Sequence, residues 1–435
     1  MPKRSFVKDS FAIFFTKIIV IFLAVGSVII LARGLGPENR GLLAALLIYP
    51  QLLIALTEGG MRQAATFYIG KKLAPEGEVL AALIFYVLTA GVLGYGLVLG
   101  LLYMVGEESF SLSMMLVAAA IIPTTLSVNA FKGYFLGKQE IKRFNKSTWM
   151  ERTLYVGLLA ILYFTDNLSV ISAVIATATA AIFNAAQAWF YVKKINESKL
   201  QLKISVVWDM LKIGSVYAFA LFLITANYKI DILLLGLLSV PAEVGYYAVS
   251  IQVAELMWQL PGAIMLVLMS RSANNKDEAE VWSEKVAIVC RLMILITIAS
   301  AVLLAIAVYL GLDLIFGSEY IPAVETTLIL LFSTIFMVPF KVLNADLAGE
   351  GRPTISILTM LPAVFLNIAL NFYLIPAYGA NGAAIATLFS YFICGVLICF
   401  FYSREKNISM SKLVFISRKD VVKVAQIMGI TRKIE

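Results

Sequence analysis

Six ionisable side chains lie inside long apolar runs of the sequence or at their edges, where a charge is most costly. They are Lys17, Glu58, Arg62, Lys229, Asp231 and Glu255. Charges at membrane depth pair with one another or line the path of an ion or a substrate. A cation there can hold an anionic group, and a buried carboxylate can carry a proton or, beside carbonyl oxygens, hold sodium. These residues therefore predict binding and ion exchange.

The elements that must position these side chains are long apolar helices. The chain has 435 residues, of which 61% are hydrophobic and 14% charged, and its mean hydropathy is +0.89. Crossing a hydrocarbon core of about 30 Å takes about 20 helical residues. Twelve such runs predict an all-α polytopic membrane protein with twelve transmembrane helices, near residues 11–32, 41–61, 79–105, 112–131, 150–165, 169–192, 213–237, 245–270, 286–311, 323–341, 354–375 and 380–402.

The distribution of basic residues predicts which side of the membrane each gap faces. Of the 35 lysines and arginines, 31 lie in every second gap between apolar runs, counting both termini. The alternate gaps hold only Arg33 and Arg40. Because cytoplasmic gaps carry the excess of basic residues, both termini are predicted to be cytoplasmic. Tyr246 and Tyr247 open a span at the outer boundary, which predicts an interfacial position for their rings.

Two repeated sequence patterns predict that the chain arose by internal duplication. Pro37 and Gly41, after the first run, recur 204 positions later as Pro241 and Gly245. A second repeated pattern, at an offset of 210 residues, relates residues 173–177 to residues 383–387. We therefore expect two parallel six-helix lobes, residues 1–195 and 213–403, joined by a cytoplasmic linker at 196–212 and followed by a basic cytoplasmic tail at 404–435.

Several classes of chemistry are disfavoured by what the sequence lacks. It contains no histidine, no Walker loop and no DxD motif. Histidine-based catalysis and nucleotide hydrolysis through a Walker loop are thereby excluded. The three cysteines lie in or beside apolar runs and imply no disulfide framework. We expect a protein that is not an enzyme, has no cofactor or metal, binds no nucleic acid and draws its energy from an ion gradient or from the membrane potential.

Turn motifs along most of the chain resemble those of the Wzx-like polysaccharide and O-antigen flippases, a branch of the multidrug/oligosaccharidyl-lipid/polysaccharide exporter superfamily. The resemblance is carried by Leu31–Gly41, Asp231, Gly245–Tyr247, Phe316–Tyr320, Gly349–Arg352, Asn367–Asn371, Ile375–Pro376 and Gly379–Thr387. Its most specific positions are structural, namely Gly36, Pro37, Gly41, Pro241 and Gly245. Because glycine and proline shape tight reversals, these motifs identify the fold better than the substrate.

The resemblance implies a V-shaped, MATE/MurJ-like transporter in a bacterial inner membrane. It would move a polyprenyl (undecaprenyl)-diphosphate-linked oligosaccharide from the inner to the outer leaflet by ion-coupled alternating access, for surface polysaccharide assembly. The coupling ion would be a proton or sodium. Besides this substrate and the membrane lipids, the implied partners are a polysaccharide polymerase and assembly proteins.

Such a substrate suggests roles for the charged and polar residues of the spans. Candidates for phosphate binding are Lys17, Arg62 and Lys229. Candidates for ion coupling are Asp231, Glu255 and Glu58. Candidates for glycan contact are Asn129, Asn227, Asn344 and Asn367.

Each role has a structural alternative. Lys17, roughly 9 Å from the cytoplasmic end of its span, can snorkel or pair with Glu58. Arg62 can be an ordinary cytoplasmic cation, and Glu255 can be neutral and bonded to a carbonyl group. The amides can bond neighbouring helices. The main functional alternative is a cation-coupled exporter of drugs or other small molecules with the same fold, which the cations Lys17, Arg62 and Lys229 disfavour.

Overall fold

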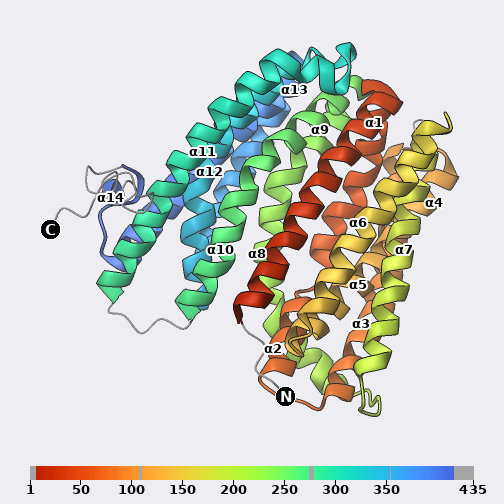
Figure 1. The fold of residues 1–435 in the computed structure, drawn as a ribbon, viewed down its shortest axis with the longest axis vertical. Helices are drawn as coiled ribbons and strands as arrows, with labels where there is room; N and C mark the ends of the chain where they lie inside the picture. The colour runs from red at the N-terminus through yellow and green to blue at the C-terminus, as the bar shows by residue number, and fades with distance from the viewer. Residues whose placement is uncertain (1–5, 107–109, 274–278, 353, 416–435) are drawn as a thin grey trace. The chain divides into compact units, whose positions relative to one another are not determined.

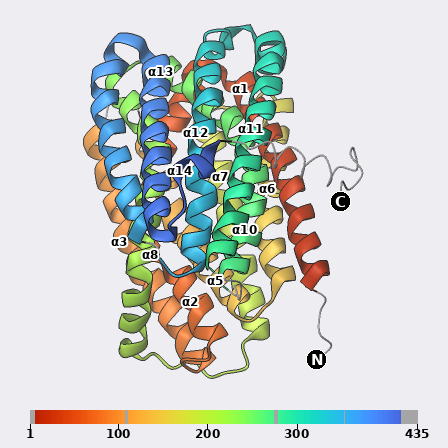
Figure 2. The same ribbon diagram turned by 90° about the vertical axis from the view of Figure 1, so that its left-hand side faces the viewer.

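The computed structural model describes residues 6–106, 110–273, 279–352 and 354–415, and within these ranges it is all-helical and contains no strand (Figures 1 and 2). The elements are α1 Phe6–Thr57, α2 Met61–Gly70, α3 Glu76–Gly106, α4 Leu112–Ala119, α5 Ile121–Gly137, α6 Ile141–Phe164, α7 Val170–Ile195, α8 Ile204–Leu238, α9 Pro241–Glu255, η1 Leu256–Trp258, α10 Gln259–Ala273, α11 Ala279–Phe316, η2 Ser318–Tyr320, α12 Ala323–Gly349, α13 Thr354–Lys406 and α14 Met410–Val414. The all-α membrane class is therefore confirmed.

Eight helical segments of the described chain are long and apolar enough to cross a membrane. Two of them contain a kink and cover two predicted spans each, because α1 breaks at Gly36 (φ 69°) and α13 at Gly379 (φ 52°). In α13 the two arms lie side by side, since Ser390 Oγ donates to the Ala363 carbonyl oxygen at 3.0 Å. The count of twelve spans and the side on which the termini lie stay predictions.

The described chain forms two compact units. Unit 1 comprises Met1–Val249 and Asp313–Ile321, and unit 2 comprises Ser250–Leu312 and Pro322–Glu435. These units do not coincide with the predicted lobes, because α8 packs on α1, α2 and α3 inside unit 1. The lobe boundaries remain a prediction. Of the predicted tail, residues 416–435 lie outside the described chain, whereas Arg404 and Lys406 end α13.

Small side chains allow the helices of unit 1 to approach closely. In one core, around α2, α3, α5 and α7, Ala64, Ala65 and Ala188 have no exposed surface. In a second core, around α1, α3, α4 and α7, the same holds for Ala118 and Ala173. Alanine and glycine are the residues that permit close backbone contact between membrane helices, where packing replaces the hydrophobic effect.

The duplicated turn motifs cross each other within unit 1. A Cβ placed on Gly41 would overlap the carbonyl group of Pro241, and a Cβ placed on Gly245 would overlap the carbonyl group of Pro37. The proline of each copy is therefore covered by the glycine of the other. This reciprocal contact explains why both copies keep the same spacing between proline and glycine.

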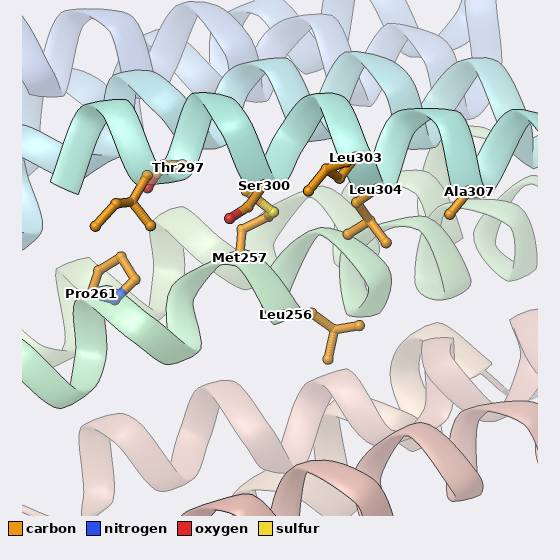
Figure 3. A pocket seen from close by; sticks show the side chains of 9 residues that line it. Leu256, Met257, Pro261, Thr297, Ser300, Leu303, Leu304 and Ala307 are labelled. Carbon is orange, nitrogen blue, oxygen red and sulfur yellow. The ribbon is translucent and has the colours of Figure 1, made fainter. Parts of the chain in front are cut away.

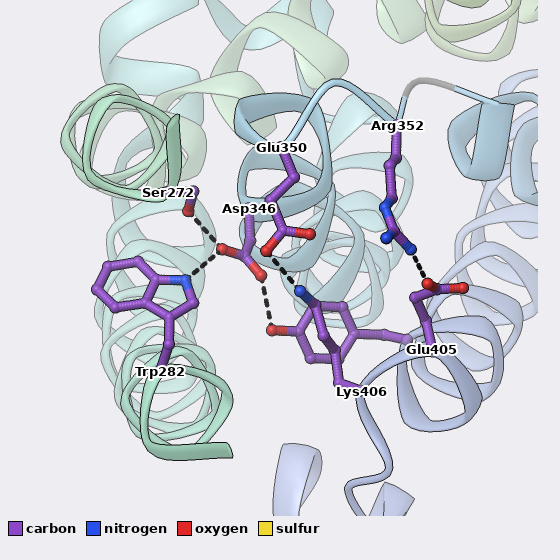
Figure 4. Close-up of polar contacts among 8 residues, drawn as sticks. Ser272, Trp282, Asp346, Glu350, Arg352, Glu405 and Lys406 are labelled. Carbon is purple, nitrogen blue, oxygen red and sulfur yellow. Dashed lines mark hydrogen bonds and ion pairs between the residues drawn. The ribbon is translucent and has the colours of Figure 1, made fainter. Parts of the chain in front are cut away.

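Unit 2 is tied together at one end by a buried carboxylate (Figure 4). Asp346, in α12, has no exposed surface and accepts hydrogen bonds from Trp282 Nε1 at 2.8 Å and from the Tyr402 hydroxyl at 2.7 Å. The Ser272 hydroxyl also donates to it. Since these donors belong to α10, α11 and α13, one side chain joins four helices. Ion pairs of Lys406 with Glu350, at 2.5 Å, and of Arg352 with Glu405 lie beside it.

Candidate functional site

A double-glycine break between α1 and α2 sets the position of Glu58. Gly59 and Gly60 adopt left-handed conformations with φ of 58° and 66°. A Cβ on Gly60 would overlap the backbone of Gly214 in α8. The helix restarts directly after the break, so Arg62 lies one turn beyond Glu58, with 3.3 Å between Arg62 Nε and Glu58 Oε1.

Glu58 belongs to a larger polar cluster inside unit 1. Asn129 of α5 donates from Nδ2 to Glu58 Oε2 at 3.0 Å. One turn further along α5, Lys132 has Glu151, Arg62, Arg152 and Glu58 as its charged neighbours. We call Glu58, Arg62, Asn129, Lys132, Glu151 and Arg152 the unit-1 polar cluster.

The far side of this cluster is fixed by amide and hydroxyl groups. Asn184 of α7 donates from Nδ2 to Glu151 Oε2 at 2.5 Å, and the Ser147 hydroxyl donates to Asn184 Oδ1 at 2.8 Å. Ser147 and Asn184 have no exposed surface. Glu151 is thereby held in one orientation, which is the preorganisation that a binding site needs.

Lys132 is the cation of this cluster whose ammonium group is available to a ligand. It is half-buried, and within the described chain no hydrogen bond or ion pair holds its ammonium group. Three cations face two carboxylates there, so the cluster can accept an anionic group. In the sequence, Lys132 is one of the basic residues of a predicted cytoplasmic gap. The missed signal is its i,i+3 spacing from Asn129, which places both side chains on one face of α5.

Asp231, a predicted coupling carboxylate, is buried in unit 1. It is 1% exposed and accepts a hydrogen bond from the Tyr247 hydroxyl at 2.8 Å. Tyr247 itself has no exposed surface, so the expected interfacial position of this ring is wrong. The physical reason is that its hydroxyl finds a partner inside the bundle. Lys229, on the same helix, is half-buried.

Glu255, the second predicted coupling carboxylate, ends α9 and lies in unit 2 near Lys341. The Lys341 Nζ atom is 3.9 Å from the centroid of the Trp258 ring. Glu255 is the acidic neighbour of the Lys341 ammonium group. A lysine over an indole face is held by the electrostatic attraction of the ring. In the sequence, Lys341 is one of the basic residues counted as cytoplasmic, and its contact with Trp258 is not predicted.

An apolar groove borders this second group. It has a volume of about 350 Å³ and lies between the η1–α10 segment and α11 (Figure 3). Most of its wall is aliphatic, and Thr297 and Ser300 supply the polar atoms. Its other lining residues are Leu256, Met257, Pro261, Ile296, Leu303, Leu304 and Ala307. Such a lining suits a hydrocarbon chain.

The remaining predicted residues are dispersed. The side chain of Lys17 lies outside the described part of the chain, so its proposed pairing with Glu58 does too. Asn227 and Asn367 have no exposed surface, and Asn371 Nδ2 donates to the Asn367 carbonyl oxygen at 2.9 Å. Asn344 accepts a hydrogen bond from the Ser356 hydroxyl. The glycan-contact roles stay predictions, and bonding between helices remains the alternative.

Comparisons with known sequences give a family and distant relatives. The family described as polysaccharide biosynthesis protein matches residues 30–325. An uncharacterized membrane protein of Methanocaldococcus jannaschii is 22% identical, over 86% of this chain and 80% of the relative. The probable low-salt glycan biosynthesis flippase Agl15 of Haloferax volcanii is 25% identical, over 38% of this chain and 36% of its own length.

Comparisons with solved structures identify the fold. The lipid II flippase MurJ, in an inward closed conformation, gives a TM-score of 0.75 at 14% identity over 98% of this chain and 94% of the other. An inward-facing multidrug resistance transporter of the MATE family gives 0.66 at 16% identity over 89% and 94%. The chain therefore has the fold that these transporters share.

Proposed function

This chain belongs to the polysaccharide biosynthesis protein family and is a multi-pass membrane transporter of the flippase type, not an enzyme, and from that premise we propose that it moves a polyprenyl-diphosphate-linked oligosaccharide between leaflets. The direction is from the inner to the outer leaflet of a cytoplasmic membrane, and the mechanism is alternating access. The observation that carries this proposal is the unit-1 polar cluster, where Lys132, Arg62 and Arg152 outnumber the carboxylates Glu58 and Glu151.

The cluster has the chemistry that a diphosphate needs. Arginine and lysine are the side chains that hold phosphate oxygens, through charge-assisted hydrogen bonds. Lys132 and Arg62 lie in gaps with a predicted cytoplasmic position, where the substrate would load. Glu58 and Glu151 keep these cations in place while the site is empty. In this mechanism the diphosphate replaces Glu58 as the partner of Arg62, and Lys17 and Lys229 act as further cations along the path.

The hydrocarbon and sugar parts of the substrate need different surroundings. The polyprenyl chain stays in lipid. The glycan needs hydroxyl partners, which Asn129 can supply once its carboxylate partner moves. Asn129 already donates to Glu58, so one displacement would free both groups.

The driving ion is proposed to act on two carboxylates, the buried Asp231 and the half-buried Glu255. A carboxylate away from water changes its charge when it binds a proton or sodium, and this change can favour one conformation over another. What supports this role for Asp231 is that Tyr247, its hydrogen-bond donor, belongs to a different helix.

The test of the proposed function is leaflet inversion of a fluorescent polyprenyl-diphosphate oligosaccharide in proteoliposomes. We expect inversion by the wild-type protein and a rate at least about tenfold lower for Lys132→Gln, the loss expected from one charge-assisted bond. Lys212→Gln is the matched control, because Lys212 is exposed and its partner Asp209 is 3.7 Å away. Efflux of an organic cation without inversion would instead identify the multidrug exporter and overturn the proposal.

Ion coupling makes a separate prediction for Asp231. We expect Asp231→Asn, which keeps the shape but fixes the charge, to make the inversion rate independent of an imposed proton or sodium gradient. Tyr247→Phe should keep that dependence and shift the ion concentration at half-maximal rate, since it removes only one hydrogen bond. The readout is the inversion rate with and without each gradient, and an unchanged response of Asp231→Asn would exclude this residue as the coupling group.

A further inference from the structure

Arg40 is a buried arginine for which the described chain supplies no counter-charge. It is 4% exposed, and its Nε atom has no acceptor. Within the described residues no hydrogen bond or ion pair involves its guanidinium group. Arg33, the other basic residue of the alternate gaps, is exposed and satisfied, because its Nε donates to the Ile315 carbonyl oxygen at 2.8 Å. Arg33 is therefore exposed and hydrogen-bonded, whereas Arg40 is buried without an acceptor.

A second orphaned polar group lies beside Arg40. Tyr320, in η2, is 1% exposed, and its hydroxyl has no hydrogen-bond partner. Arg40 and Tyr320 are electrostatic neighbours, and Tyr155 of α6 is the other neighbour of Arg40. Burial raises the pKa of Tyr320 above its ordinary value, so this hydroxyl stays protonated and can donate. Two buried donors without acceptors are therefore electrostatic neighbours inside unit 1.

The surrounding backbone adds positive potential. Arg40 lies in the first turn after the break at Gly36, near the positive end of the dipole of the α1 arm that follows. The N-terminal turn of α9 packs against it through Gly41 and Gly245. The positive charge of an arginine is repelled by the positive end of the dipole at a helix N-terminus. A buried arginine there is therefore stabilised by a nearby negative charge.

The nearby carboxylates do not supply that charge. Glu319 lies next to Gly36, since one of its oxygens is 3.1 Å from the position of a Cβ on that glycine. Glu319 and Glu243 are both neighbours of Tyr246. Neither forms an ion pair with Arg40 in the described chain, and Glu38, on the same turn, is exposed.

We propose that Arg40 and Tyr320 bind a small inorganic anion of chloride size at this end of unit 1. Water could satisfy the two donors but would leave the buried guanidinium charge uncompensated, and an anion satisfies both needs. The low exposure of both side chains excludes a bulky ligand such as a lipid headgroup. The bound anion would hold together α1, α6 and η2 beside the crossing of the duplicated turns, so the stability of the folded protein depends on it.

The test uses the full-length protein in neutral detergent, dialysed against gluconate at constant ionic strength and titrated with chloride. We expect a saturable rise in the melting temperature with chloride, because a ligand that binds only the folded state stabilises it. Arg40→Gln should abolish the rise, and Arg33→Gln, the matched control, should retain it. Equilibrium dialysis with radioactive chloride should give the same order of affinities, with no binding to Arg40→Gln.

A milder variant protects the test against misfolding of Arg40→Gln. Tyr320→Phe removes one donor and should weaken chloride affinity roughly tenfold, with the folded protein retained. Equal melting temperatures of the wild type in gluconate and chloride would overturn the proposal and leave water as the occupant. Stabilisation by inorganic phosphate but not by chloride would overturn it as well. Because these readouts need no transport, they are independent of the proposed flippase activity.

Discussion

Replacing Asp346 with alanine will lower the melting temperature of the protein by several degrees, through a loss of about 3 kcal/mol or more in the free energy of unfolding. The carboxylate has no exposed surface and accepts three hydrogen bonds, from Ser272, Trp282 and Tyr402. Its removal leaves three buried donors without an acceptor, and each unsatisfied donor costs about 1–3 kcal/mol. Four helices of unit 2 also lose their common contact (Figure 4).

Two further variants isolate the cause. Asp346→Asn keeps one acceptor oxygen and should lose less stability than the alanine variant. Asp209→Ala serves as the matched control, because Asp209 is exposed and its 3.7 Å ion pair with Lys212 contributes little. The measurement is thermal unfolding of purified protein, followed by size-exclusion chromatography. If Asp346→Ala melts together with the Asp209→Ala control, the four-helix tie does not stabilise unit 2.

Alanine at either glycine of the crossed turns should prevent correct folding. A Cβ on Gly41 or on Gly245 would overlap the backbone of the opposite turn, and a backbone carbonyl cannot rotate away as a flexible side chain can. We therefore expect Gly41→Ala and Gly245→Ala to reduce the yield of monodisperse protein severely. Gly96→Ala is the matched control, because nothing lies within 4 Å of a Cβ at that position of α3.

The two glycines also make a prediction about additivity. Gly96→Ala should be neutral or stabilising, since alanine favours helix by up to about 1 kcal/mol over glycine. The double variant Gly41→Ala, Gly245→Ala should be less harmful than the sum of its parts, because one displacement of the turns relieves both overlaps. Normal yields of both single variants would show that the turns have room to separate.

The sequence was sufficient for the fold class because apolar length and turn chemistry are local properties. The runs predicted the membrane helices, and Gly36 with Pro37 predicted the break in α1, since only glycine enters that backbone region without strain. The two matching turns were also visible, because their crossing requires a small residue at both Gly41 and Gly245.

The candidate site could be predicted only in part. Glu58 and Arg62 were found because a charge inside an apolar run is conspicuous. Lys132 and Lys341 were missed because they lie at the ends of predicted spans, where the positive-inside rule already explains a basic residue. Whether a residue at a helix end points to water or into the bundle depends on tertiary packing, and periodicity over a few residues does not record it.

The reciprocal contact of the two turn motifs has an evolutionary consequence. After a duplication, two copies are ordinarily free to diverge, each under its own constraints. Here Gly41 cannot enlarge unless the backbone at Pro241 moves, and Gly245 cannot enlarge unless the backbone at Pro37 moves. Each copy therefore restricts the mutations available to the other. The proline–glycine spacing of the two turns should remain recognisable in the sequence long after the surrounding helices have lost their sequence similarity.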